Sequence, residues 1–246
     1  MKIAVYTDYK HNNDVLCTRL AEGASDAHIK TIDADDILGD QLKEYEVLAM
    51  PGGADLYYCE KLNGAANAKI RQFVDSGGKY LGICAGAYYG ASQLRWAGDR
   101  VDDAICGTRE LAFVQGIAVG PIGEYMEGDF EQSWDGVCQL GTPGGIVYAI
   151  YRGGCYFKNF DGADVFATYA NLANQPPAII GQRVGDGYAL LSGPHIEMRG
   201  TDYTRTLYKH RNNSYNYECG VADQMSPYDP ENDSYWKKLL NELIEK

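Results

Sequence analysis

The chain has 246 residues, of which 22 are Lys or Arg and 34 are Asp or Glu, and its formal net charge is −12. A hydrophobic fraction of 45% excludes a wholly disordered chain, because that much apolar surface can offset the entropy lost on ordering. The acidic balance argues against a nucleic-acid-binding surface, which needs an excess of Lys and Arg.

The distribution of apolar residues and of metal-ligating residues excludes further classes. No apolar run approaches the roughly 18 residues of a membrane span, and the apolar stretch at the N-terminus is too short for a signal-peptide core. The seven Cys include no C-x-x-C pair, and none of the four His lies in a cluster with Cys. We therefore expect a cytoplasmic protein that uses no metal or cofactor and contacts neither membrane nor nucleic acid.

The first hundred residues alternate between short apolar runs and segments with helical spacing. This alternation is typical of βαβ units, so it predicts a parallel sheet with crossover helices. The expected strands are 2–7, 29–32, 47–50 and 80–83, and the expected helices are 15–21, 65–74 and 85–94.

From about residue 110 to 190 the chain is rich in Gly, aromatic and β-branched residues, which predicts a β-rich insertion with some antiparallel pairing. Strands are expected at 146–151, 165–169, 178–184 and 188–191. Residues 200–233 are polar and Tyr-rich and have no strong period. At about 230–246, Trp236, Leu239, Leu240, Leu243 and Ile244 form one helical stripe, which indicates a helix docked on the sheet. All 246 residues are expected to form one domain.

The sharpest motif is Gly82-Ile83-Cys84-Ala85-Gly86, which follows a predicted strand and opens a predicted helix. A nucleophile elbow has this arrangement, with glycines where side chains would collide with neighbouring strands. The start of a helix also favours the thiolate form of Cys84. The alternative is a buried cysteine in a small-residue turn.

Two further segments follow predicted strands and would lie at the same edge of the sheet. Pro51-Gly52-Gly53 can direct the Gly53 N–H, together with that of Ala85, at an oxyanion, although it could be a plain turn. His195 and Glu197 are two residues apart, so in extended backbone they point to one side, where the carboxylate can orient the imidazole. A surface or structural His–Glu pair is the alternative.

Together the PGG, G-x-C-x-G and H-x-E segments resemble the class I glutamine amidotransferase-like superfamily. MPGGADLYYCEKLNG, IRQFVDSGGKYLGICAGAYYGAS, RELAFVQGIAVGPI and SGPHIE are similar to the N-terminal domain of eukaryotic biotin–protein ligases, over roughly residues 1–200. The resemblance implies a flavodoxin-like α/β core with a nucleophile (Cys84), a base (His195) and an orienting acid (Glu197). The sequence has no basic Gly-rich biotinoyl-adenylate loop, so ligase activity is not expected.

The sequence departs from true glutamine amidotransferases at one position of the elbow. Their motif continues Cys-x-Gly-x-Gln, and that Gln holds the substrate glutamine, whereas Tyr88 stands here. Gly52, Asp55, Tyr58 and Tyr88 are expected to line the substrate pocket. Arg109-Glu110 could bind a carboxylate-bearing ligand or form an exposed ion pair.

Three functions remain open. The first is a Cys-His-Glu amide hydrolase or amidotransferase that acts on a small amide or peptide. For an amidotransferase, a partner protein would accept the ammonia. The second is a non-catalytic binding or regulatory module that keeps the elbow as a ligand cradle. The third is a peptidase of the same superfamily.

Overall fold

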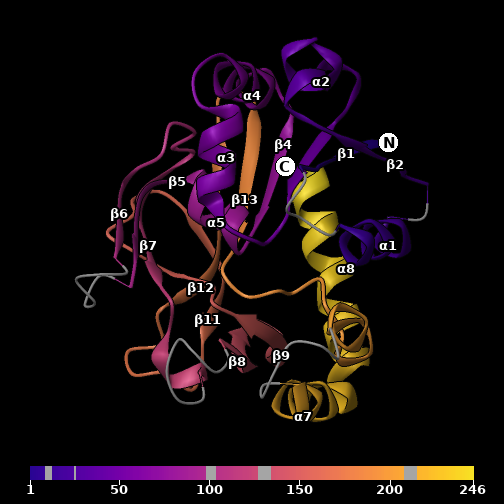
Figure 1. Ribbon diagram of the computed structural model, residues 1–246, viewed down its shortest axis with the longest axis vertical. Coiled ribbons are helices and arrows are strands. Elements are labelled where there is room, and N and C mark those ends of the chain that lie inside the picture. The colour runs from indigo at the N-terminus through magenta and orange to yellow at the C-terminus, as the bar shows by residue number, and fades with distance from the viewer. Residues whose placement is uncertain (9–12, 25, 98–103, 127–133, 208–214) are drawn as a thin grey trace.

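The computed structural model describes residues 1–8, 13–24, 26–97, 104–126, 134–207 and 215–246. Nine of the described strands form one mixed sheet: β1 (Lys2–Tyr6), β2 (His28–Ile32), β3 (Val47–Met50), β4 (Lys79–Ile83), β8 (Asp135–Thr142), β9 (Gly145–Arg152), β11 (Asp164–Tyr169), β12 (Pro177–Val184) and β13 (Gly187–Ser192). Their order is β2-β1-β3-β4-β13-β12-β11-β8-β9 (Figure 1). Neighbours from β2 to β13 pair in parallel, and those from β13 to β9 pair antiparallel. The predicted parallel sheet and the partly antiparallel second half are both confirmed.

A second, smaller sheet lies beside the first. Its strands are β5 (Ala91–Trp96), β6 (Ile105–Thr108), β7 (Val114–Gly120) and β10 (Tyr156–Lys158), in the order β10-β7-β5-β6. Strands β5 and β7 pair in parallel, and the other two pairs are antiparallel. The β-rich half of the chain thus divides between the extended main sheet and this second sheet.

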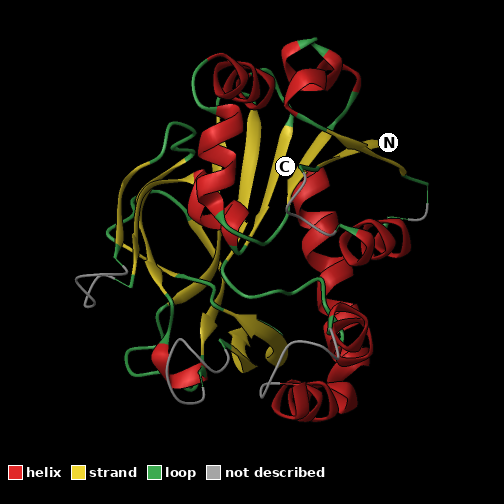
Figure 2. Cartoon of the chain, in the orientation of Figure 1, coloured by secondary structure: helices red, strands yellow, loops and turns green. Residues whose placement is uncertain are grey.

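Helices cover both faces of the parallel part of the main sheet (Figure 2). On one face lie α3, α4 and α5, and on the other lie α1 and α8 (Figure 1). The helices are α1 (Asp14–Gly23), α2 (Ala34–Leu38), α3 (Asp55–Leu62), α4 (Ala65–Asp75), α5 (Ala85–Gly90), α6 (Gly200–Tyr203), α7 (Tyr215–Met225) and α8 (Asp229–Glu245). Short 3₁₀ turns occupy 41–44, 123–125, 204–206 and 226–228.

The side chains of the parallel strands alternate between two hydrophobic clusters, one on each face. In β1, Ile3 and Val5 pack in the cluster that contains Trp236 of α8, whereas Ala4 and Tyr6 pack in the cluster under α3 and α4. Both faces are buried, as expected of a parallel sheet covered by helices. The helix expected at about 230–246 corresponds to α8, which packs Trp236, Leu239 and Leu243 against the sheet.

The helix predicted at 85–94 is wrong in its second half. It ends at Gly90, and residues 91–96 form strand β5 between β6 and β7. A Cβ at Gly90 would lie 2.6 Å from Leu191 Cδ2, so the chain leaves the helix where it passes closest to β13. Pairing with β6 and β7, which follow later in the chain, overrides the weak helical preference of this segment.

Helices α2, α3, α6 and α7 have no counterpart among the predicted elements. The first three are short, with four to eight residues, too few for a clear apolar period. Helix α7 lies in the polar, Tyr-rich region and buries Glu218 beside Val221, Ala222 and Met225, so its inner face is not purely apolar.

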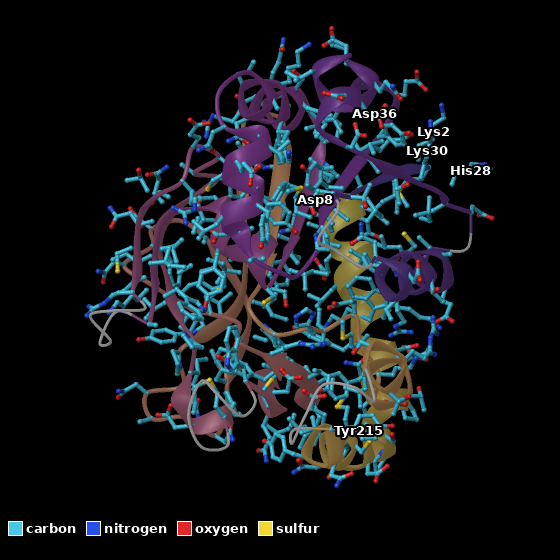
Figure 3. The ribbon with its side chains drawn as sticks, viewed as in Figure 1. Lys2, Asp8, His28, Lys30, Asp36 and Tyr215 are labelled. Atoms are coloured by element: carbon cyan, nitrogen blue, oxygen red, sulfur yellow. The ribbon has the colours of Figure 1, made fainter. Side chains whose placement is uncertain are left out.

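Strand β2 is the outer edge of the parallel sheet, next to β1. Lys2, His28 and Lys30 lie along this side of the molecule (Figure 3), and His28 and Lys30 are exposed on β2. Charged side chains on an edge strand oppose pairing with another chain. Within the described ranges, no helix has both the length and the apolar character that crossing a membrane requires.

Candidate active site

Cys84 stands between the end of β4 and the start of α5 with a φ of +51°, a conformation that L-residues rarely adopt. Hydrogen bonds on both sides hold this backbone. Its N–H donates to Ser192 O of β13 (2.8 Å), and its carbonyl accepts from the N–H groups of Ala87 and Tyr88 (both 3.0 Å). The local geometry is that of the predicted elbow.

The two flanking glycines are required by close approaches. A Cβ at Gly86 would lie 2.2 Å from the carbonyl oxygen of Met50, on the neighbouring strand β3. A Cβ at Gly82 would lie 2.4 Å from Gly86 O, across the turn itself. Real Cβ contacts are not this short, so neither position accepts a larger residue without a backbone shift.

His195 and Glu197 follow β13 and form a buried pair. His195 Nδ1 lies 2.7 Å from Glu197 Oε1, and the two side chains are 6% and 3% exposed. The N–H of His195 also donates to Ile150 O of β9 (2.8 Å). The bond through Nδ1 leaves Nε2 as the ring atom for a second partner.

That second partner is Cys84. Burial disfavours the protonated imidazole, but the charges of Glu197 and of a Cys84 thiolate, with hydrogen bonds to both side chains, outweigh it and raise the pKa of His195 to about 10. Cys84 Sγ also lies 3.4 Å from Arg152 O, which accepts from the thiol. Cys84 Sγ therefore has two polar neighbours, the carbonyl oxygen of Arg152 and the ring of His195.

The raised pKa of His195 predicts a pH dependence of stability. A group whose pKa is higher in the folded state contributes fully below its unfolded value, near 6.5, and loses that contribution as pH rises toward 10. We expect the free energy of unfolding of the wild type to fall by a few kcal/mol across this window, relative to His195→Gln. Urea titrations of both proteins at several pH values measure the difference, which a constant gap between the two proteins would contradict.

The Pro51-Gly52-Gly53 turn lies against the pair. A Cβ at Gly52 would lie 2.3 Å from His195 Cε1 and 3.4 Å from Cys84 Cβ, so the turn packs against both His195 and Cys84. Pro51 O accepts from Gly86 N (3.2 Å), which ties the turn to α5. Within the described residues, no backbone acceptor engages the N–H of Gly53 or of Ala85, the two groups predicted to hold an oxyanion.

Tyr58 and Tyr88 were predicted to line a pocket, and the structure places both inside the protein. Tyr58 is fully buried behind the turn, where its hydroxyl donates to Pro51 O (2.8 Å). Tyr88 is 4% exposed, and its hydroxyl donates to Gly153 O (3.2 Å). In this arrangement Tyr58 supports the turn, and Tyr88 fills the space beside the elbow.

Asp55 forms a buried ion pair that the sequence did not indicate. Its Oδ2 lies 2.6 Å from Arg109 Nε, and the two side chains are about nine-tenths buried. The expected exposed Arg109–Glu110 pair is wrong, because Glu110 instead accepts from Gly64 N and from Asn67 Nδ2. Arg109 Nη2 has no hydrogen-bond partner in the described part of the chain.

Three residues near the pair are not singled out by the sequence. Arg152 is the last residue of β9, and its carbonyl contacts Cys84 Sγ. Arg19 and Asn232 contact the segment that carries His195 and Glu197. The signal for Arg19 and Asn232 in the sequence is weak, since each is a polar residue on the apolar face of its helix.

A cavity of about 810 Å³ lies away from this site. It is lined by residues at the start of β3 and β4, such as Val47 and Lys79, whereas Cys84 follows the end of β4. The described residues also include no cluster of three His, Cys, Asp or Glu that could hold a metal ion. Cys84, His195 and Glu197 therefore lie at the opposite end of these strands from the cavity.

Comparison with known families and proteins agrees with the resemblance seen in the sequence. The family model described as "Biotin-protein ligase, N terminal" matches residues 17–245, which extends the similarity beyond residue 200. An uncharacterized protein of Chlamydia muridarum is 38% identical over 159 residues, covering 62% of this chain and 60% of that protein. The biotin–protein ligase of Schizosaccharomyces pombe is 33% identical over 162 residues, covering 61% of this chain and 25% of the ligase. The matches thus span less than two thirds of either relative.

Solved structures show the fold. A glutamine amidotransferase from Thermotoga maritima matches with a TM-score of 0.62 at 11% identity, covering 100% of this chain and 98% of that one. A Thermoplasma acidophilum protein described as part of a GMP synthase matches with a TM-score of 0.50 at 15% identity, covering 100% and 98%. The architecture is the flavodoxin-like fold of these amidotransferases, as predicted.

Proposed function

Since the chain belongs to the biotin–protein ligase N-terminal family and brings Cys84, His195 and Glu197 to one edge of its sheet, we propose that it is a cysteine-dependent amide hydrolase or amidotransferase. One observation carries the proposal: a buried His–Glu pair adjoins a cysteine held in a strained elbow. A structural role alone gives no reason for a φ of +51° at a cysteine.

The proposed reaction begins with the Cys84 thiolate. Its sulfur attacks the amide carbonyl carbon, a C–S bond forms, and the carbonyl electrons move onto oxygen, where the N–H groups of Gly53 and Ala85 stabilise them. The C–N bond then breaks as His195 passes its proton to the departing nitrogen. Water then attacks the thioester carbonyl, and His195 takes a proton from that water. The C–S bond breaks, which releases the carboxylic acid and returns Cys84 to its thiolate form.

Glu197 acts through His195 in this scheme. Its carboxylate keeps the proton on Nδ1, so that Nε2 faces the sulfur, and it stabilises the imidazolium. Gly52 leaves room for the ring. Tyr58 supports the turn through its hydrogen bond to Pro51 O.

This function is tested by measuring turnover of primary amides, short peptides and glutamine by the wild type and by Cys84→Ala. Turnover of at least one amide that Cys84→Ala abolishes is expected. We expect little ammonia release from glutamine at millimolar concentration, because the buried Tyr88 occupies the position of the superfamily's glutamine-binding residue. Rapid glutamine hydrolysis that depends on Cys84 would contradict this role of Tyr88, and cleavage of peptides alone would favour the peptidase.

The second candidate is a binding or regulatory module. It is favoured by the low exposure of Cys84, 4%, and by the hydrogen bond from its thiol to Arg152 O, which both suit a closed cradle. This candidate predicts ligand-induced thermal stabilisation with no product formed, in the wild type and in Cys84→Ala alike. An ammonia-accepting partner protein belongs to the amidotransferase proposal, and ammonia transfer in its presence tests it.

A further inference from the structure

The segment that carries His195 and Glu197 is held by two side chains far away in the sequence. Arg19 Nε of α1 donates to Glu197 O (2.9 Å), and Asn232 Nδ2 of α8 donates to Ile196 O (3.2 Å). Arg19 is 1% exposed and Asn232 is fully buried. Two consecutive carbonyls within the H-x-E segment therefore have buried partners from the helices on one face of the sheet.

The two helices are joined to each other at the same place. Arg19 Nη2 donates to Asn232 Oδ1 (3.4 Å), and Trp236 Nε1 donates to Arg19 O (2.9 Å). Helices α1 and α8 lie side by side next to the sheet (Figure 1). The three residues form one polar unit within an otherwise apolar interface.

The carboxylate of Glu197 needs such support from its backbone. Its Oε1 meets His195 Nδ1, but its buried Oε2 has no hydrogen-bond partner among the described residues. No second bond thus fixes the carboxylate itself. Its position follows from the backbone of residues 196–197, which Arg19 and Asn232 hold.

A buried guanidinium is a costly way to pack two helices together. Arg19 is compensated by Glu22 (3.0 Å), Asp233 (2.5 Å) and Asp202 (3.8 Å), and an apolar residue could fill the same interface without these partners. Buried polar groups can specify one geometry at the expense of stability. The geometry specified here is that of the backbone beneath Glu197.

We propose that Arg19 and Asn232 are positioning residues for the His195–Glu197 pair, and that they couple helices α1 and α8 to the reactivity of Cys84. The link to Cys84 rests on the proposed function. The positioning of the His195–Glu197 pair does not rest on the proposed function, because the titration of His195 measures it directly.

The experiment compares Arg19→Lys and Asn232→Ser with a matched control, Arg199→Lys. Lysine keeps the charge of Arg19 but cannot donate to Glu197 O while pairing with Asp233. Arg199 belongs to the same charge cluster, where it contacts Glu22, Asp202 and Asp233. Two quantities are measured on folded protein: the titration midpoint of the His195 ring by NMR, and the rate of Cys84 alkylation against pH.

We expect Arg19→Lys to lower the His195 midpoint by about one pH unit and to slow alkylation at pH 7 about tenfold. Asn232→Ser should act in the same direction, and it gives the same comparison if Arg19→Lys does not fold. Arg199→Lys should leave the His195 midpoint almost unchanged and the alkylation rate within about twofold of wild type. An unchanged His195 midpoint in both variants, even with a lower melting temperature, would reduce Arg19 and Asn232 to structural roles and overturn the proposal.

The two proposals fail in different ways. If wild-type Cys84 is not preferentially alkylated and yet the His195 midpoint moves with Arg19→Lys, the hydrolase proposal fails and the positioning stands. If wild-type Cys84 is reactive and the midpoint does not move, the positioning fails and the hydrolase proposal stands.

Discussion

Brief exposure to iodoacetamide near neutral pH is expected to label Cys84 ahead of the other six cysteines. The imidazolium of His195 and the start of α5 both favour its thiolate, which is the form that reacts. Burial raises the pKa of four other thiols, those of Cys17, Cys59, Cys138 and Cys155. Cys106 is the strongest competitor, because it is exposed whereas Cys84 is 4% exposed.

The triad predicts how two variants change this rate. His195→Ala removes the cation beside the sulfur, and Glu197→Gln keeps the shape of the acid but removes the charge that stabilises the imidazolium. Both should slow Cys84 labelling by about tenfold or more at neutral pH, with the larger effect for His195→Ala. Mass-spectrometric mapping over time gives the rate for each cysteine, circular dichroism checks folding, and labelling of Cys106 is the internal control.

Each possible departure from this result has a definite meaning. A wild-type rate in Glu197→Gln, with slow labelling in His195→Ala, would make Glu197 a bystander. Wild-type rates in both variants would mean that the helix start alone activates Cys84, and they would favour the binding module. Labelling of other cysteines with Cys84 untouched would count against a nucleophile altogether.

Alanine substitutions at Gly86 and Gly52 should have different effects, one mainly on the free energy of unfolding and the other mainly on the alkylation rate of Cys84. Gly86→Ala places a methyl group 2.2 Å from the backbone oxygen of Met50, so β3 or α5 must move. We expect it to lower the free energy of unfolding by about 3 kcal/mol or more, at the upper end of the range for overpacking. Gly52→Ala meets a side chain, His195, so we expect the ring to rotate away and Cys84 labelling to fall with a smaller loss of stability.

Gly123→Ala is the control for both variants, because a Cβ there meets nothing within 4 Å and its φ lies outside the left-handed region. Urea unfolding and the alkylation rate are measured for all three proteins. Wild-type stability in Gly86→Ala would show that the elbow has more room than this structure gives it. Wild-type labelling in Gly52→Ala would show that His195 does not need its present position.

The elements with a strong local signal could be predicted from the sequence. The strands 47–50 and 80–83 are short, apolar and bounded by Gly or Pro, and their pattern is independent of what packs on them. The three chemical segments could also be placed together, because each follows a strand and the ends of parallel strands meet at one edge of the sheet. The stripe from Trp236 to Leu243 likewise predicts α8 by its period alone.

Long-range contacts decided the rest. Residues 91–96 form a strand because they pair with β6 and β7. Asp55 pairs with Arg109, which comes from a distant segment. No local sequence pattern shows either contact. The motifs alone were enough to predict a cysteine, a histidine and a glutamate at the sheet edge, because each motif follows a strand. Their surroundings depend on how the whole chain packs: the carbonyl of Arg152 lies on the sulfur, and Arg19 and Asn232 contact the backbone beneath Glu197. A buried polar group takes its partner from whatever packs against it, and that partner is set by the arrangement of helices and not by the neighbouring residues.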